Sequence, residues 1–546
     1  IGQVGVTDDF FELGGDSIIV IQVVSRSQKK GYNLQVQDLF DYPTIEELSI
    51  TIEKNGEEFN TAEQGLLEGE VPLSPIQNWF FETQEETVSH FNQAILLSID
   101  KDIKEERLAT IIDLISKRHD SLRFRYAREI VGGKEQWKQF YEVTSNFFRT
   151  EYIEEENYSA EVITAICEKY QKTLDIENGD LVRFVFIRTP DSEIYNRLFI
   201  VSHHLAIDGV SWRFIIDDLE ILFRGANDFD TLSFLERKPS SFREWVNKLI
   251  NFTESEEIES ELDYWKLIKK DYTPVPTDIS SGRPTRKTIT TVSATLNKEY
   301  TNHLLKVNHV YNTEINDLML SALQISFQEV FDLPKLALGF EGHGRENIFP
   351  DINLAGTTGW FTNKYPIILS RGETKTNGDI IKSVKETLRK IPNNGIGYGC
   401  LRYLHSSLAI RDSLKGRGWD VVFNYLGQID NVFNRNKYLH PASESTGTFV
   451  GESSLLQEKF IVKAIIVENE LRVSWDYSKA EYYEVTVEKL AENFIKSLTG
   501  IIDHCLQKEI CEMTPSDFGL SGKLDTKEFE ALFESDESQE VNDLKF

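Results

Sequence analysis

The sequence predicts an α+β protein in which a small helical unit precedes a much larger mixed unit. The chain has 546 residues, which is too long for one ordinary hydrophobic core. Apolar runs typical of strands, such as residues 181–187, alternate with segments of helical periodicity at 104–117 and 379–389. A polar linker at 56–70 separates residues 1–55 from the rest of the chain. We therefore expect several domains with separate cores.

The first unit contains the sequence Leu13-Gly14-Gly15-Asp16-Ser17, which predicts a tight turn that leads into a helix. Apolar residues follow Ser17 at helical spacing: Ile18, Ile21 and Val24. A serine at the start of a helix is exposed and can be reached by a modifying enzyme. In the alternative interpretation, Asp16 or Ser17 only caps the helix.

Composition and charge argue against several classes of partner. The 59 basic and 89 acidic side chains give a formal net charge of −30, which is unfavourable for binding to nucleic acid or to an anionic membrane surface. No apolar run reaches the length of a membrane span. The four cysteines are Cys167, Cys400, Cys505 and Cys511. They lack the paired spacing of a disulfide framework or a zinc site, so we expect no bound metal and a cytoplasmic location.

Two adjacent histidines, His203 and His204, follow the apolar run 198–201 and precede a helix-like segment at 210–215. Imidazole is a base at neutral pH, so a strand that ends in histidine is a candidate for proton transfer. Neighbouring side chains on a strand point to opposite faces, and therefore only one of the two can serve a given site. The alternative interpretation is that both histidines are hydrogen-bonded structural residues.

Residues 9–18 resemble the attachment site of a peptidyl carrier domain of nonribosomal peptide synthetases, whose serine carries a 4′-phosphopantetheine arm. The resemblance covers residues 1–55. It implies that Ser17 is the attachment residue and that a phosphopantetheinyl transferase modifies it. The first helix of a carrier domain would precede Ile1, so we expect this helix to be missing.

Residues 71–80, 118–123 and 203–209 resemble three motifs of the condensation-domain superfamily of the same synthetases, in the expected order. This resemblance implies a chloramphenicol-acetyltransferase-like fold, with an N-lobe at 71–248, a C-lobe at 249–510 and a tunnel between them. The superfamily contains domains that form amide bonds and domains that invert an α-carbon. Motifs that resemble those of the epimerization branch lie in the second half of the chain, at 340–346, 359–366 and 423–430.

Epimerization of a carrier-bound thioester needs two acid/base groups on opposite sides of a planar intermediate and a donor near the thioester oxygen. The resemblance implies that His204 and Glu341 are the acid/base pair and that Tyr425 lies in the same pocket as a donor or proton relay. The other motif residues are expected to be structural: His203 in packing, Asp208 in an ion pair, Gly209 in the turn, and Arg345 near the site. Taken alone, the segment around Arg345 could also be a solvated turn with a surface ion pair.

We therefore interpret the chain as a carrier–epimerization didomain, an isomerase that converts an aminoacyl or peptidyl group on Ser17 from L to D. The alternatives are a condensation domain that joins two carrier-bound acyl groups and a carrier-docking module without chemistry. The expected partners are an upstream adenylation domain and a downstream condensation domain. Residues 511–546 form an acidic tail with a partly apolar helix at 524–534, which predicts a docking segment for a separate subunit or, alternatively, a truncated linker.

Overall fold

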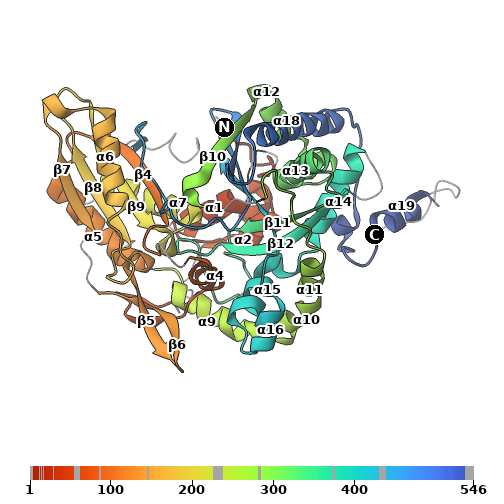
Figure 1. Ribbon diagram of the computed structural model, residues 1–546, viewed down its shortest axis with the longest axis horizontal. Helices are drawn as coiled ribbons and strands as arrows, with labels where there is room; N and C mark the ends of the chain where they lie inside the picture. Colours follow the sequence, from red (N-terminus) through yellow and green to blue (C-terminus); the bar gives the residue numbers. More distant parts are fainter. Residues whose placement is uncertain are drawn as a thin grey trace.

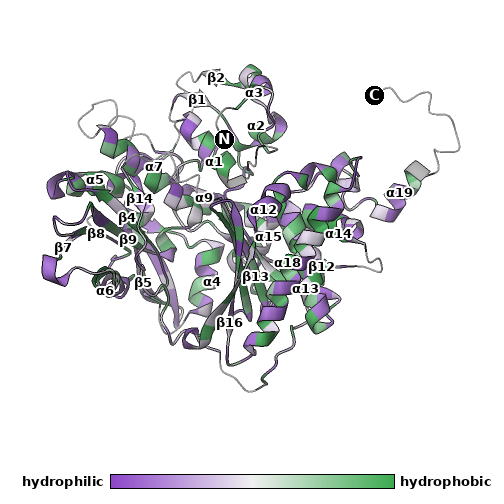
Figure 2. Cartoon of the chain, turned by 90° about the horizontal axis from the view of Figure 1, so that it is seen from above, coloured by the Kyte–Doolittle hydropathy of each residue, from purple (hydrophilic) through white to green (hydrophobic). Residues whose placement is uncertain are grey.

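The computed structural model describes residues 4–11, 13, 15, 17–28, 30–54, 62–84, 88–143, 147–225, 238–280, 284–371, 376–428 and 438–534. Two lobes that contain β-sheets lie side by side, and the N-terminal helical domain lies over their junction (Figures 1 and 2). Every helix in these residues is too short or too polar to serve as a membrane span.

The N-terminal domain is a small helical unit, as the sequence predicts. Its elements are α1 (Ser17–Gln28), β1 (Tyr32–Asn33), α2 (Val36–Asp41), α3 (Ile45–Thr51) and β2 (Glu53–Lys54). Its core is formed by apolar residues of α1, of α2 and of the segment between them: Val20, Val24, Leu34 and Leu39. Thr44 caps α3, because its hydroxyl accepts a hydrogen bond from the Glu47 backbone N–H at 3.2 Å.

The N-lobe is built on a five-stranded sheet with the order β14-β4-β9-β8-β7. The strands are β4 (Asn92–Asp100), β7 (Phe148–Tyr152), β8 (Val182–Arg188), β9 (Tyr195–His203) and β14 (His440–Pro441). Helices α5 (Glu105–Arg118) and α7 (Gly209–Gly225) cover one face of the sheet, and α6 (Ala160–Gln171) covers the other. Alternate residues of β8 enter the two cores on either side of the sheet, which explains why this strand is apolar on both faces apart from Arg183 and Arg188.

A smaller sheet of order β3-β6-β5 shares its core with the C-lobe. Its strands are β3 (Gly69–Val71), β5 (Phe124–Val131) and β6 (Lys134–Tyr141). Helix α4 (Pro75–Thr83) follows β3 and begins as its sequence suggests, with Ser74 as N-cap and Pro75 in the first turn.

The C-lobe is built on a six-stranded mixed sheet with the order β10-β16-β15-β13-β11-β12. The strands are β10 (Ile289–Leu296), β11 (Lys335–Gly342), β12 (Asn363–Ser370), β13 (Val421–Gln428), β15 (Phe460–Val467) and β16 (Glu470–Ser478). Strand β13 runs parallel to both of its neighbours, and the other pairs are antiparallel. Among the described residues between α7 and the tail, the helices are α9 (Phe242–Thr253), α10 (Glu256–Ser260), α11 (Leu262–Lys270), α12 (Lys298–Leu304), α13 (Ile315–Phe331), α14 (Asn377–Arg389), α15 (Ile396–Gly399), α16 (Leu408–Ser413) and α18 (Glu484–Leu506).

The two lobes exchange segments, so the predicted boundary at residue 248 does not separate them. Helix α9 spans that position, and its Phe242 packs against Phe361 of the C-lobe with 5.0 Å between ring centroids. Strand β14, which comes late in the chain, adds an antiparallel edge strand to the N-lobe sheet through its pairing with β4. The sheets themselves lie in the predicted halves of the chain, apart from this strand.

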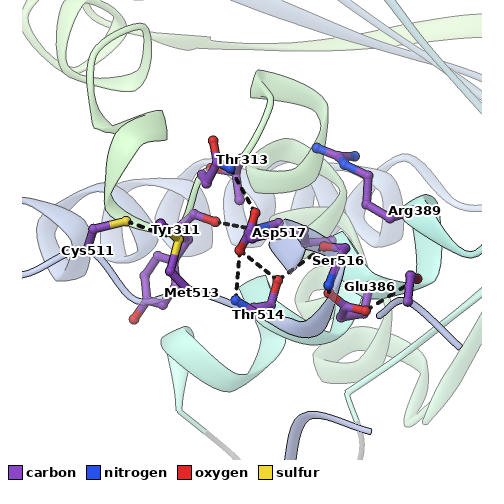
Figure 3. Close-up of polar contacts among 12 residues, drawn as sticks. Tyr311, Thr313, Glu386, Arg389, Cys511, Met513, Thr514, Ser516 and Asp517 are labelled. Atoms are coloured by element: carbon purple, nitrogen blue, oxygen red, sulfur yellow. Dashed lines mark hydrogen bonds and ion pairs between the residues drawn. The ribbon is translucent and has the colours of Figure 1, made fainter. Parts of the chain in front are cut away.

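The predicted tail at 511–546 also belongs to the C-lobe in its first part. Figure 3 shows the polar contacts around Asp517, which forms a 2.7 Å ion pair with Lys385 of α14. Glu386 of α14 accepts the backbone N–H of Ser516 at 2.9 Å. The C-lobe therefore extends past residue 511 at least to Phe518.

The predicted helix at 524–534 is present as α19 (Thr526–Glu534). Its Phe529 is buried and lies 5.4 Å from Phe518 between ring centroids. Lys382 of α14 forms a 2.6 Å ion pair with Glu530. One side of α19 thus contacts its own C-lobe, and the acidic residues that follow at 535–546 lie outside the described residues.

Candidate active site

His204 lies directly after β9, in a short 3-10 turn. Its ring stacks on Trp360, with 4.1 Å between centroids and an interplanar angle of 29°. Its Nδ1 lies 2.8 Å from the Ile207 carbonyl oxygen, and its Nε2 lies 2.8 Å from the side-chain amide nitrogen of Gln93. Burial lowers the pKa of His204 and outweighs the opposing effects of backbone hydrogen bonds and the Asp208 carboxylate. The imidazole is therefore uncharged at neutral pH.

His203 is the last residue of β9 and is completely buried. Its Nε2 lies 2.8 Å from the Val88 carbonyl oxygen, and its Nδ1 accepts the backbone N–H of Leu205 at 3.1 Å. Burial lowers its pKa to about 3. Because both ring nitrogens bind the backbone, His203 fixes the turn in which His204 lies.

Asp208 and Arg345 form a buried ion pair between the two halves of the predicted site. The Arg345 Nη1 lies 2.7 Å from Asp208 Oδ2, and its Nη2 lies 3.1 Å from Oδ1. Ser211 donates its hydroxyl to the same carboxylate at 2.7 Å. Burial tends to raise the pKa of Asp208, but the Arg345 charge and these hydrogen bonds hold it below its usual value. Arg345 is thus buried in this ion pair and does not form a surface ion pair.

Glu341 lies on β11, and its carboxyl contacts side chains from both neighbouring strands. Its Oε2 accepts a hydrogen bond from Asn424 Nδ2 on β13 at 3.1 Å, and its Oε1 lies 3.6 Å from Lys364 Nζ on β12. Burial raises the pKa of Glu341, and the negative charge of Glu458 raises the pKa further. The positive charge of Lys364 lowers the pKa, but by less than burial raises it. A carboxyl group with a raised pKa can hold and release a proton closer to neutral pH, as an acid/base catalyst must.

Lys364 is a buried cation between two carboxylates. Its Nζ lies 2.6 Å from Glu458 and 3.6 Å from Glu341. The same atom lies 4.3 Å from the Trp79 ring centroid and 5.6 Å from that of Trp419. Burial tends to lower the pKa of Lys364, but the two carboxylates outweigh it and raise the pKa above its usual value. Since Glu458 is the closer partner, the charge of Lys364 compensates Glu341 only in part.

Two tryptophan rings and the ammonium group of Lys364 form a chain of contacts between the two candidate acid/base groups. Trp360 stacks on His204, and its ring centroid lies 6.3 Å from that of Trp79. Trp79 in turn contacts Lys364, which contacts Glu341. A chain of side-chain contacts therefore connects His204 of the N-lobe with Glu341 of the C-lobe.

Asn424 of β13 hydrogen-bonds Glu341 through its side chain. Phe340 pairs in register with Phe423, so Glu341 and Asn424 share the next position on the same face of the sheet. Strand alternation directs Tyr425 to the other face, where it packs against the C-lobe core. Sequence reasoning missed Asn424 and Lys364, although both lie inside motifs that it singled out.

The carrier helix α1 packs on α7, the helix that follows the His204 turn. Ile21 lies in one apolar cluster with Val210 and Phe214. Arg26 forms a two-point ion pair with Asp217, with N···O distances of 2.8 and 3.0 Å. The residue numbers of the contacting side chains rise together along α1 and α7. The two helices therefore run parallel, and the start of α1 lies on the same side as the start of α7.

Ser17 is the first residue of α1, one helical turn before Ile21, and its side chain lies outside the described part of the structure. Gly209 is the first residue of α7 and is exposed. Its φ is not in the left-handed region, and a Cβ at this position would meet no atom within 4 Å. The turn therefore does not require glycine, contrary to the sequence-based expectation.

One group of potential metal ligands occurs among the described residues: Glu254, Glu259 and His405. His405 Nδ1 accepts the backbone N–H of Ser407 at 2.9 Å, so the proton of the neutral ring is on Nε2. That atom faces Glu259 at 3.5 Å. A protonated nitrogen does not coordinate a metal ion, and the arrangement favours a weak contact between an N–H group and a carboxylate.

Comparison with known proteins identifies two families that match this chain. The family described as "Phosphopantetheine attachment site" matches residues 1–52, and the family described as "Condensation domain" matches residues 67–519. The chain belongs to the condensation-domain family. The attachment domain that precedes its condensation domain carries covalently bound 4′-phosphopantetheine.

Two relatives of this condensation-domain protein are subunits of larger synthases. Surfactin synthase subunit 2 of Bacillus subtilis (strain 168) is 36% identical over 521 residues, which cover 95% of this chain and 14% of that protein. Gramicidin S synthase 1 of Brevibacillus brevis is 34% identical over 551 residues, which cover 98% of this chain and 49% of that protein. The chain thus spans less than half the length of each relative.

A solved structure extends the comparison to the fold. The crystal structure of the epimerization domain from the third module of tyrocidine synthetase B is 32% identical, with a TM-score of 0.74, and the match covers 82% of this chain and 99% of that one. Three expectations are confirmed: a nonribosomal peptide synthetase carrier followed by a condensation-superfamily domain, the chloramphenicol-acetyltransferase-like fold, and the phosphopantetheine cofactor.

Proposed function

We propose that this chain epimerizes the α-carbon of an aminoacyl or peptidyl group, from L to D, while the group is held as a phosphopantetheine thioester on Ser17. The observation that carries the proposal is Glu341, a carboxyl with a raised pKa that a chain of side-chain contacts connects to the uncharged His204. Inversion needs two acid/base groups, whereas amide formation can proceed with one base. The 32% identity to a solved epimerization domain supports the same choice.

The chemistry follows from the protonation states of the two residues. The phosphopantetheine arm supplies a thioester, which makes the α-hydrogen of the acyl group more acidic. His204 accepts this hydrogen as a proton at Nε2, from which the Gln93 amide must turn away, while its Nδ1 N–H stays bonded to the Ile207 carbonyl. Glu341 gives a proton to the opposite side of the α-carbon. The enzyme then holds an imidazolium and a carboxylate, so the total number of protons is unchanged, and reverse transfer or exchange with water restores the starting state.

The residues around the pair orient it. Asn424 fixes one oxygen of Glu341, and Trp360 supports the ring of His204. We assign Asp208 and Arg345 to the positioning of the two segments that carry the catalytic groups. Tyr425 stays a proposed donor near the site, although strand alternation directs it away from the face of Glu341.

Chiral analysis of the loaded chain tests the proposal. A phosphopantetheinyl transferase and an L-aminoacyl-coenzyme A load Ser17, and the acyl group is released after incubation in heavy water. We expect the D form to accumulate and to carry deuterium at the α-carbon. Glu341→Gln and His204→Asn should each slow inversion about 100-fold or more, the usual range for loss of a general acid or base. The control Glu135→Gln, at an exposed position of β6, should not change the rate.

Other results identify the alternatives. Inversion at the wild-type rate in Glu341→Gln contradicts the assignment of two acid/base groups. Formation of an amide bond with a second acylated carrier, without deuterium exchange, identifies a condensation domain. Absence of both reactions in the loaded wild-type chain identifies a carrier-docking module without chemistry.

The same proposal assigns partners. An upstream adenylation domain would supply the acyl group, and a downstream condensation domain would consume the D form. The C-terminal tail would bind that condensation domain when it lies on a separate subunit. Helix α19 supports this role in part, since its Leu532 is 55% exposed while Phe529 contacts the C-lobe.

A further inference from the structure

Gln93 lies between His204 and a tryptophan of α7, and no sequence motif pointed to it. It is the second residue of β4, and its backbone pairs with Ser202 on β9. The two ends of its amide group each contact one ring: the nitrogen lies 2.8 Å from His204 Nε2, and the oxygen accepts the indole N–H of Trp212 at 2.8 Å. Gln93 is thus the only link between these two rings that the described contacts give.

The tryptophan determines which way the amide points. An indole nitrogen can only donate a hydrogen bond, so the end of Gln93 that faces Trp212 must be the oxygen. The other end is therefore the NH2 group, and it donates to His204 Nε2. Both ends of the group agree on one orientation, which removes the usual ambiguity of a side-chain amide.

The backbone confirms the same tautomer from the opposite side of the ring. His204 Nδ1 faces the Ile207 carbonyl, which can only accept, so the ring proton is on Nδ1. His204 Nε2 is then an acceptor, as the Gln93 amide requires. The three hydrogen bonds run in one direction, from Trp212 through Gln93 and His204 to Ile207.

We propose that Gln93, fixed by Trp212, is a positioning residue that keeps His204 in the Nδ1–H tautomer and opposes protonation of Nε2. A proton on Nε2 would face the NH2 group of Gln93. Rotation of the amide would relieve that clash but would place the NH2 group against the indole N–H of Trp212. Protonation of Nε2 therefore costs one hydrogen bond in either orientation of the amide, at His204 or at Trp212, and the proton that His204 accepts is readily given up.

The groups that face His204 offer little compensation for a positive charge. Gln93 of β4, Phe91 just before that strand and Trp360 before β12 face the ring, and all three are uncharged. Asp208 favours the charged ring, but its carboxylate is already paired with Arg345. The adjacent His203 is neutral, and burial of His204 acts in the same direction as Gln93.

This inference rests on the proposed role of His204 as a base, but its test does not need turnover. The full chain is labelled with 15N-histidine, the His204 signals are assigned with His204→Asn, and the ring nitrogens are followed through a pH titration. In the wild type we expect Nε2 to give the signal of an unprotonated nitrogen and the pKa to lie below the usual histidine value. Trp212→Phe frees the amide to rotate, so the pKa should rise by about one unit, as expected for one hydrogen bond regained.

A second variant and a control variant complete the experiment. Gln93→Glu presents only acceptor oxygens to His204 and should raise its pKa further than Trp212→Phe does. Trp475→Phe changes a buried tryptophan of β16 remote from these contacts and should leave the His204 pKa unchanged. A wild-type Nε2 that carries the proton, or an unchanged pKa in both Trp212→Phe and Gln93→Glu, would overturn the inference. Failure of inversion with the expected titration would instead count against the proposed function alone.

Discussion

The carboxylate of Asp208 and the guanidinium of Arg345 connect the segment that carries His204 to the segment that carries Glu341. Both side chains are almost completely buried, and two hydrogen bonds of 2.7 and 3.1 Å join them. The turn before Arg345 requires Gly344, because φ is 67° there and a Cβ would lie 1.8 Å from the Phe361 carbonyl oxygen. The relative position of the two acid/base groups therefore depends on a few buried contacts.

Removal of Arg345 should destabilise the protein strongly. Arg345→Met leaves the Asp208 carboxylate buried without its cation, which typically costs about 3–5 kcal/mol. The double variant Asp208→Asn with Arg345→Met should recover part of this loss, because no unpaired charge remains. Unfolding in denaturant measures the change. Lys117→Met, which breaks an exposed ion pair with Asp113, is the control and should shift the midpoint little.

The pH dependence of inversion should respond to the two partners of Lys364 in opposite directions. Lys364 lowers the pKa of Glu341, and Glu458 raises it. Lys364→Met should therefore shift the pH profile of α-deuterium exchange to higher pH by about one unit, and Glu458→Gln should shift it to lower pH. Lys335→Met, at an exposed position of the same strand as Glu341, is the control. Shifts in the same direction would contradict this electrostatic account.

Contacts between α1 and α7 should matter only for substrate that the carrier presents. Arg26→Glu breaks the ion pair with Asp217 and places two carboxylates together. We expect inversion of the Ser17-bound acyl group to slow, more at low salt than at high, while a soluble aminoacyl-pantetheine is inverted at the wild-type rate. The exchanged pair Arg26→Glu with Asp217→Arg should restore the rate. Equal slowing with the soluble substrate would mean that the change acts on the site itself.

Ser17 should be the only residue that accepts the phosphopantetheine arm. Incubation with a phosphopantetheinyl transferase and coenzyme A should add one arm to the wild type and none to Ser17→Ala, as measured by mass spectrometry of the intact protein. Ser17→Ala should also lose inversion in cis. An equal mass gain in both proteins would remove the assignment of Ser17.

Two truncations should separate the tail into a structural part and a binding part. Deletion of 522–546 removes α19 but keeps Asp517, so inversion should stay intact while transfer to a downstream condensation domain weakens, more at low salt. Deletion of 511–546 also leaves Lys385 buried without Asp517, and should lower the free energy of unfolding by about 3 kcal/mol or more. Loss of inversion after deletion of 522–546, or unchanged transfer to the downstream condensation domain, would contradict the role of α19 and the following residues in binding that domain.

The sequence predicted the parts of this structure that depend on local pattern. The apolar run 181–187 and the helix at 524–534 have the periodicity of their elements, and both are present. The contact of Asn424 with Glu341 was not predictable, because it depends on the register between two strands more than 80 residues apart. Gln93 lies 111 residues before His204, and no local signal relates the two.

Strand β14 has a consequence for any attempt to recombine this protein with its relatives. It consists of two residues and completes the N-lobe sheet from a position deep in the C-terminal half of the chain. A chimera joined at residue 248 would therefore combine an N-lobe from one parent with an edge strand from the other, and would also divide α9 between them. The interchangeable unit is therefore the whole two-lobed domain.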